Sequence, residues 1–172
     1  ARMFFHTGSA WEESDGTIKF DVVLYKEPVL GVGGGAAEIR GEWSGHDPFY
    51  DGLLTQVVIP TSGDAKLVET DIAGEFPQVD PRYRGKRRQL TALTSGATTA
   101  RPGTTGLATH NWETGESRNF EFGDNRIVEE FLFVPKAGSQ SDLDNWLVGP
   151  VLNLKAGVTE ICVFEAANVS EG

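Results

Sequence analysis

Residues 17–25 read TIKFDVVLY, and every second residue from Ile18 to Leu24 is large and apolar. A period of two is typical of a β-strand that buries one face and turns the other to water. Other segments with strand-like patterns follow along the chain: 53–59, 66–72, 88–93, 106–112, 118–122, 127–134, 146–154 and 160–166. No window carries a helical stripe, so the sequence predicts an all-β fold, either a sandwich, a barrel or a propeller.

Length and charge limit the classes of function. The chain has 172 residues, enough for one domain with a hydrophobic core. The formal net charge is -10, from 25 acidic and 15 basic side chains, which disfavours general nucleic-acid binding. The basic run at 82–88 is therefore expected to form a charged turn that pairs with nearby carboxylates.

The single cysteine, Cys162, lies in an apolar strand-like segment, which predicts a buried and unreactive thiol. Because no intramolecular disulfide can form, we expect a reducing compartment such as the cytoplasm. No run approaches the roughly 18 apolar residues of a membrane-spanning helix. The chain opens with Ala1 rather than Met and stops at Gly172 without an evident closing element, which suggests a piece of a longer protein.

The three histidines, His6, His46 and His110, lack the spacing of common metal-binding motifs. His6 directly follows Phe4 and Phe5. An imidazole behind bulky apolar residues suits either a metal ligand or a packed core histidine. His46 and His110 lie in or near turn-forming segments, and we expect both to be exposed to solvent.

Two glutamates stand next to apolar residues. Glu75 lies between Gly74 and Phe76, at the start of a stiff segment that contains two prolines. Glu130 directly precedes Phe131. A carboxylate in an apolar setting must be hydrogen-bonded, paired or protonated, so each glutamate can serve either the fold or a site.

Four short segments, in order, resemble the carotenoid cleavage oxygenase family, which includes carotenoid- and stilbene-cleaving dioxygenases and the retinoid isomerohydrolase. They read FHTGSAWEE at 5–13, GEFPQVDPRY at 74–83, EFLFVPK at 130–136 and DLDNWL at 142–147. Three positions depart from the family pattern. Ser9 replaces the usual Asn, Phe131 replaces Pro, and Asn145 replaces Gly.

The resemblance implies a seven-bladed β-propeller with ferrous iron, Fe(2+), on its axis, held by four histidines. Residues 1–172 would then form a single partial propeller domain, an interior fragment that supplies roughly three blades. His6 corresponds to one of the iron ligands, and Glu75 to the carboxylate that orients it. Glu130 corresponds to the carboxylate that orients the last histidine of the family, which lies outside this chain.

The implied reaction of the parent protein is the oxidative cleavage by O2 of a conjugated C=C bond in a hydrophobic substrate, an apocarotenoid or a stilbene-like compound. Phe4, Phe5 and Trp11 are candidates for the wall of the substrate site, although a core role is equally open. The fragment alone is expected to be inactive and to need the rest of the propeller, and peripheral membrane contact is a further expectation. The alternative is a metal-free β-rich scaffold or binding module in which His6 is a core residue.

Overall fold

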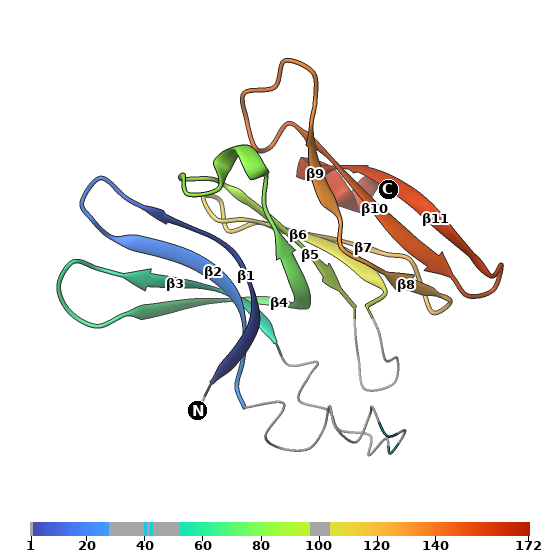
Figure 1. Cartoon of the computed structure of the whole chain (residues 1–172), viewed down its shortest axis with the longest axis horizontal. Coiled ribbons are helices and arrows are strands. Elements are labelled where there is room, and N and C mark those ends of the chain that lie inside the picture. Colours follow the sequence, from blue (N-terminus) through green and yellow to red (C-terminus); the bar gives the residue numbers. More distant parts are fainter. Residues whose placement is uncertain (1, 28–39, 41, 43–51, 97–103) are drawn as a thin grey trace.

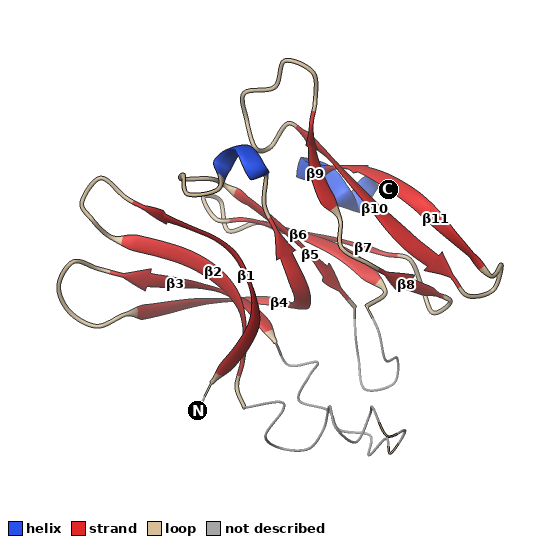
Figure 2. Ribbon diagram, viewed as in Figure 1, coloured by secondary structure: helices blue, strands red, loops and turns tan. Residues whose placement is uncertain are grey.

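The computed structural model describes residues 2–27, 40, 42, 52–96 and 104–172, so His46 lies outside the described residues. Its strands are β1 (Met3–Glu12), β2 (Ile18–Tyr25), β3 (Leu53–Ile59), β4 (Lys66–Gln78), β5 (Leu90–Ser95), β6 (Gly106–Asn111), β7 (Ser117–Glu121), β8 (Arg126–Val128), β9 (Leu132–Pro135), β10 (Asn145–Asn153) and β11 (Val158–Glu165). The short 3-10 helices η2 (Pro81–Tyr83) and η3 (Ala166–Glu171) accompany them. Strands dominate these parts (Figures 1 and 2), which confirms the all-β class. Within the same parts, no helix has the length and apolar character needed to cross a membrane.

Strands β1 to β7 form one antiparallel meander, in which each strand pairs with the next along the chain. The long strand β4 pairs with β3 through its first half and with β5 through its second half. The meander therefore divides into a first blade, with β1 to β3, and a second blade, with β5 to β7. A third blade contains β8 to β11. The three blades fan out in order from blue to red (Figure 1), as expected of consecutive parts of a propeller.

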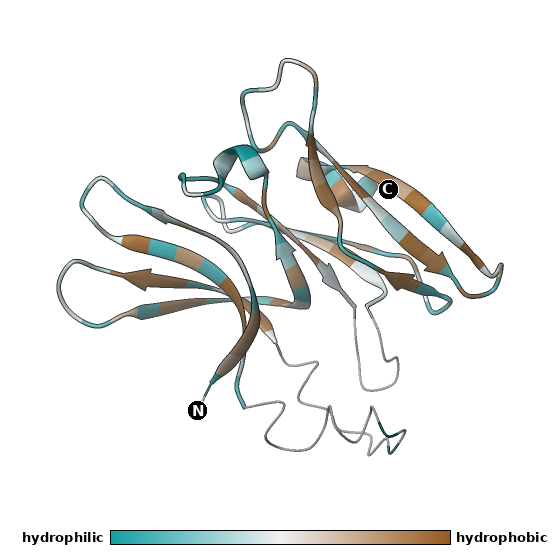
Figure 3. Ribbon diagram, viewed as in Figure 1, coloured by the Kyte–Doolittle hydropathy of each residue, from teal (hydrophilic) through white to brown (hydrophobic). Residues whose placement is uncertain are grey.

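Two hydrophobic clusters lie between neighbouring blades. The cluster between the first and second blades contains Val23, Tyr25, Leu54, Leu93 and Ala108. The cluster between the second and third blades contains Leu90, Ala92, Leu107, Val128, Phe131, Phe133, Leu147, Val151, Phe164, Ala166 and Val169. Several strands alternate between apolar and polar residues (Figure 3), so a blade can bury one face against its neighbour. The blades are thus held together mainly by apolar surface that is removed from water.

The outer face of the third blade is apolar and exposed. Leu132, Val148 and Val163 form one cross-strand row on β9, β10 and β11. Ile161 lies two residues before Val163 on the same face of β11 and is 69% exposed. Phe164, on the opposite face, is buried in the core. A sheet with apolar side chains on both faces is normally covered by protein on both.

The single strand expected at 127–134 is two short strands in the structure. β8 and β9 both pair with β10, and residues 129–131 interrupt them. In this interruption Phe131 turns inward and is 2% exposed. Its ring fills the space beside Gly149, where an added Cβ atom would lie 2.5 Å from the ring. The alternating pattern predicts a continuous strand because it does not reveal an irregularity of this kind.

We expect Gly149→Ala to lower the free energy of unfolding by about 1–3 kcal/mol, because the added methyl group overpacks the Phe131 ring. Urea denaturation measures the loss. The double variant Gly149→Ala/Phe131→Leu is the control, since it also removes the ring. It should lose less stability than the sum of the two single variants. Strictly additive losses would show that the two residues do not interact.

Strand β1 is not among the segments predicted as strands, and its pairing is irregular. A Thr-Gly-Ser run at 7–9 interrupts its apolar pattern, so the pattern does not predict a strand there. In the structure, the pairing of β1 with β2 shifts register between Phe4 and Thr7 and again between Thr7 and Ala10. Such irregularities let a strand continue across residues that break the period of two.

Two predictions of burial are wrong. His110, expected to be exposed, is only 6% exposed, because β6 lies between β5 and β7 in the second blade. This burial lowers the pKa of His110, whose Nδ1 atom lies 3.0 Å from the Oγ atom of Ser117. Cys162, expected to be buried, is half-buried on β11. Its partial burial raises the pKa of the thiol.

Candidate metal centre

His6 lies on β1, where that strand departs from regular pairing with β2. Its Nδ1 atom is 2.9 Å from the Oε2 atom of Glu75 on β4, a residue 69 positions later in the sequence. The His6 side chain is 47% exposed, whereas the Glu75 side chain is only 6% exposed. The imidazole is therefore anchored by a buried carboxylate and still reaches the surface of the chain.

Glu75 reaches His6 because β4 changes its conformation at this point. The pairing of β4 with β5 shifts register between Glu75 and Gln78. Phe76 has a φ angle of 55°, which is unfavourable for a residue with a large side chain. Its ring packs against the imidazole of His6, with centroids 4.7 Å apart. Strained backbone of this kind gathers at functional sites, where the surrounding structure holds it in place.

Both oxygens of the Glu75 carboxylate accept hydrogen bonds. The hydroxyl group of Tyr25 donates to Oε1. The backbone N–H of Phe76 donates to Oε2 at 3.0 Å. Since both carboxylate oxygens accept hydrogen bonds, the contact between Oε2 and His6 Nδ1 is satisfied when Nδ1 carries the proton and donates it to Glu75.

This tautomer leaves the Nε2 atom of His6 with a free lone pair. A histidine that gives one N–H to a carboxylate and offers the other nitrogen is the usual arrangement of a metal ligand. His6 and Glu75 therefore fit the iron-binding role that the family resemblance implies. Among the described residues, no group of three or more His, Cys, Asp or Glu side chains could hold a metal ion. The described part of the chain thus provides one oriented imidazole.

Glu130 lies in the interruption between β8 and β9, and it is exposed. Its Oε2 atom accepts a hydrogen bond from the side-chain amide of Gln78 at 2.9 Å. Gln78 ends β4, the strand that carries Glu75. Glu130 is thus joined to the strand of the candidate centre, and its proposed role toward a further histidine stays a prediction.

The three aromatic candidates for the substrate wall lie in different environments. Phe4 is 52% exposed. Phe5 is half-buried and packs edge-on against the ring of Tyr25, with centroids 5.6 Å apart. Trp11 is 5% exposed, and the guanidinium of Arg88 lies 5.1 Å from its ring centroid. Trp11 therefore takes the core role that the sequence left open, whereas Phe4 and Phe5 lie beside His6 in the chain.

Three arginines of the basic run at 82–88, Arg82, Arg87 and Arg88, pair with carboxylates, as predicted. Arg82 Nη2 lies 2.6 Å from Oδ2 of Asp80. Arg88 forms a fully buried ion pair with Asp21, which joins the second blade to the first. The sequence predicts that these cations are paired, but it does not identify either aspartate as the partner.

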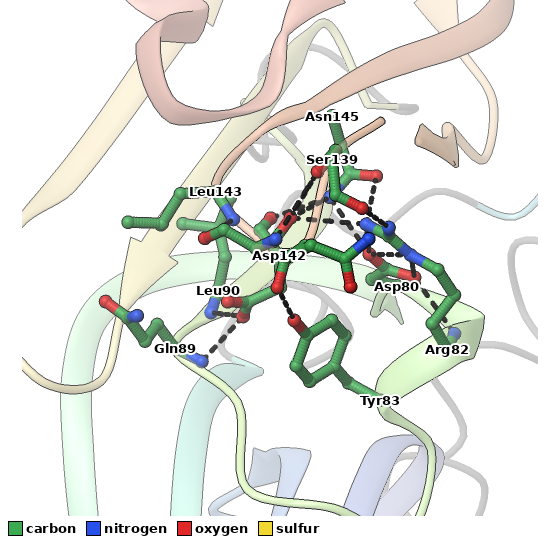
Figure 4. A network of polar contacts seen from close by, with 11 residues as sticks. Asp80, Arg82, Tyr83, Gln89, Leu90, Ser139, Asp142, Leu143 and Asn145 are labelled. Atoms are coloured by element: carbon green, nitrogen blue, oxygen red, sulfur yellow. Dashed lines mark hydrogen bonds and ion pairs between the residues drawn. The ribbon is translucent and has the colours of Figure 1, made fainter. Parts of the chain in front are cut away.

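A polar network surrounds the buried carboxylate of Asp80 (Figure 4). Arg82 donates to Asp80 and also to the Ser139 carbonyl at 2.7 Å. Asn145 donates to Oδ2 of Asp80 at 3.0 Å. Asp142 accepts hydrogen bonds from two backbone N–H groups at the start of β5. The network therefore ties the connection between β4 and β5 to the loop that precedes β10.

Sequence reasoning did not single out this network as a site. Asp80 and Arg82 lie in the second segment of the family resemblance, and Asp142 and Asn145 lie in the fourth. The joint appearance of both segments was the available signal. Burial by itself would raise the pKa of Asp80, but hydrogen bonds from Arg82 and Asn145 outweigh it and lower the pKa below its ordinary value.

Known proteins resemble the chain in both sequence and structure. A family model described as retinal pigment epithelial membrane protein (RPE65) matches residues 1–171. Resveratrol cleavage oxygenase 1 of Botryotinia fuckeliana (strain B05.10) is 29% identical over 106 residues, which are 58% of this chain and 19% of that protein. The crystal structure of the cobalt-substituted apocarotenoid oxygenase (ACO) of Synechocystis matches with a TM-score of 0.78 and 18% identity. An ACO/RPE65 chimera matches with a TM-score of 0.77 and 17% identity.

Each of the two solved structures matches 99% of this chain, which covers 35% of the solved chain. The chain thus spans about a third of the solved enzymes and 19% of the curated relative. The structural match confirms the propeller fold, and the family model covers nearly every residue. The chain belongs to the carotenoid cleavage oxygenase family.

Proposed function

We propose that the full-length protein is a non-haem iron(II) dioxygenase that cleaves a conjugated C=C bond with O2 and forms two carbonyl products. One observation carries the proposal: the imidazole of His6 is held through Nδ1 by the buried carboxylate of Glu75. Iron(II), when bound, would activate O2, while the alkene itself supplies the electrons and the two oxygen atoms end in the two carbonyl products. The cobalt-substituted state of the Synechocystis relative supports a divalent metal ion in this fold.

The residues of this chain have distinct proposed roles. The Nε2 atom of His6 is the metal ligand. Glu75 fixes the tautomer and the ring angle of His6. Glu130 orients a histidine that belongs to another part of the protein. These roles require carboxylates that accept hydrogen bonds, and Glu75 accepts them at both of its oxygens.

The proposed substrate is hydrophobic and conjugated, either an apocarotenoid or a stilbene-like compound. The names of the two relatives support these two classes, since one is a resveratrol oxygenase and the other an apocarotenoid oxygenase. Phe4 and Phe5 are the proposed apolar wall near His6. The ring of Phe76, which packs against the imidazole, adds apolar surface on another side.

The other metal ligands are proposed to come from the rest of the same propeller. Further blades would also cover the exposed apolar face of β9, β10 and β11, on which Leu132, Ile161 and Val163 are more than half exposed. An apolar face of this kind supports the view that the described blades are consecutive parts of a larger ring. This chain alone is therefore proposed to be inactive.

The test measures bound iron and O2-dependent cleavage in the full-length protein. Resveratrol and an apocarotenal are the substrates, and chromatography detects the carbonyl products. We expect His6→Ala to lose both bound iron and cleavage, because it removes a ligand. Glu75→Gln should lower iron affinity about 10- to 100-fold, because the imidazole loses its ionised partner.

Glu116→Gln is the matched control. Glu116 is an exposed carboxylate that pairs with Arg118 on the hairpin between β6 and β7, away from His6. This variant should keep the iron content and the activity of the unmodified protein. Unchanged iron in His6→Ala would contradict the ligand role and favour a metal-free scaffold. Iron binding without cleavage of either compound would contradict the substrate class.

A further inference from the structure

Tyr25 is buried at the end of β2, and its hydroxyl group contacts the candidate metal centre. The side chain has no exposed surface and belongs to the cluster between the first and second blades. The edge-on ring of Phe5 packs against it, with an interplanar angle of 79°. The hydroxyl group donates to Oε1 of Glu75. A core tyrosine thus presents its polar end to the carboxylate that holds His6.

The Glu75 carboxylate is held at each of its two oxygens. Tyr25 donates to Oε1, while the backbone N–H of Phe76 donates to Oε2. His6 Nδ1 shares that second oxygen at 2.9 Å. A carboxylate with a donor on each oxygen cannot rotate about its last bond without losing a hydrogen bond, so the direction of Oε2 is set by Tyr25 and Phe76 together.

The two donors are not equivalent. The Phe76 N–H belongs to the same peptide segment as Glu75, and the positive φ angle of Phe76 places it there. The Tyr25 hydroxyl comes from another strand, 50 positions earlier in the sequence. It therefore supplies the long-range restraint on the carboxylate, in a buried environment where hydrogen bonds to charged groups are strong.

We propose that Tyr25 is a positioning residue of the metal centre. Its hydroxyl group orients the Glu75 carboxylate, and the carboxylate in turn orients His6 so that Nε2 points to the metal. The inference rests on the proposed role of His6 as a ligand. It goes beyond that role because it assigns part of the geometry of the ligand to a residue whose hydroxyl group donates to Glu75.

The experiment compares Tyr25→Phe with the unmodified full-length protein. The probe is Co(2+), whose affinity is measured by competition with a chelator and whose absorption spectrum reports the ligand geometry. We expect Tyr25→Phe to weaken Co(2+) binding about 10-fold, in line with the loss of one hydrogen bond to a charged group. The visible absorption bands of bound Co(2+) should also shift, because the imidazole is held less firmly.

Two control variants separate positioning from stability. Tyr83→Phe removes a hydroxyl group that donates to the Gln140 carbonyl at 2.5 Å, outside the metal centre. Leu54→Val removes one methylene group from the same core cluster as Tyr25 and keeps the hydroxyl group. Both controls should leave the Co(2+) affinity and spectrum unchanged, whatever they do to the melting temperature.

The outcomes distinguish this inference from the proposed function. If Glu75→Gln weakens binding but Tyr25→Phe changes neither affinity nor spectrum, Tyr25 is a core residue only and the inference is overturned. An equal effect of Leu54→Val would overturn it too, because packing would then explain the result. If His6→Ala binds Co(2+) as tightly as the unmodified protein, the proposed function itself fails.

Discussion

Asp21→Ala is expected to lower the free energy of unfolding by about 3–5 kcal/mol, because it leaves the Arg88 guanidinium unpaired in the core. Neither side chain of this ion pair has exposed surface. The Thr91 hydroxyl also donates to Asp21 Oδ2 at 2.9 Å. Burial lowers the pKa of Arg88, and the charge of Asp21 opposes that change. Urea denaturation at neutral pH measures the loss of stability.

The controls for this prediction change the charge elsewhere or remove both charges. Asp15→Ala removes an exposed carboxylate from the turn between β1 and β2, and it should have a far smaller effect. The double variant Asp21→Ala/Arg88→Leu should be more stable than Asp21→Ala alone, because no unpaired charge stays buried. A loss for Asp21→Ala as small as that for Asp15→Ala would contradict the prediction.

Asp80→Ala is expected to lower the free energy of unfolding by about 3 kcal/mol at neutral pH. The carboxylate is fully buried and accepts hydrogen bonds from Arg82 and Asn145. Its removal takes away the charged acceptor that both partners share, leaves Arg82 without its carboxylate, and loosens the connection between the second and third blades. Urea denaturation measures the loss, with Asp64→Ala in the exposed turn after β3 as the control.

The effect of Asp80→Ala should depend on pH. The folded structure lowers the pKa of Asp80, so the ionised form stabilises the fold above the unfolded pKa of about 3.9. This contribution is lost as the pH falls below about 4 and passes through the lower pKa of the folded state. The stability difference between the unmodified protein and Asp80→Ala should therefore shrink in acid. An equal difference at pH 7 and in strong acid would contradict the pKa shift.

The sequence predicts most strands because the period of two is a local property. The segment at 53–59 coincides with β3, and the others overlap observed strands. The failures have a common cause. β1 contains two register shifts, and the 127–134 segment contains an inward-turning Phe131. Irregularities of pairing depend on the neighbouring strand, so a pattern read along one strand does not reveal them.

The candidate metal centre, too, was predicted only in part. The family resemblance places His6 and Glu75 in one centre, and the structure brings them within hydrogen-bond distance. The resemblance does not contain Tyr25 or the positive φ angle of Phe76, which together orient the carboxylate. Both depend on how β2 and β4 meet, which is a matter of tertiary packing.

By itself, the sequence determined three things. Alternation of apolar and polar residues gave the all-β class, the excess of acidic side chains predicted that arginines of the basic run are paired, and four short motifs gave the family. All three signals can be read without knowing which strands lie side by side. The tertiary structure alone decided that His110 is buried, that Asp21 is the partner of Arg88, and that Tyr25 holds Glu75. Each of these contacts joins residues on different elements or depends on a neighbouring strand. Burial and hydrogen bonding of these residues depend on how the strands and blades pack together, so the local sequence pattern does not predict them.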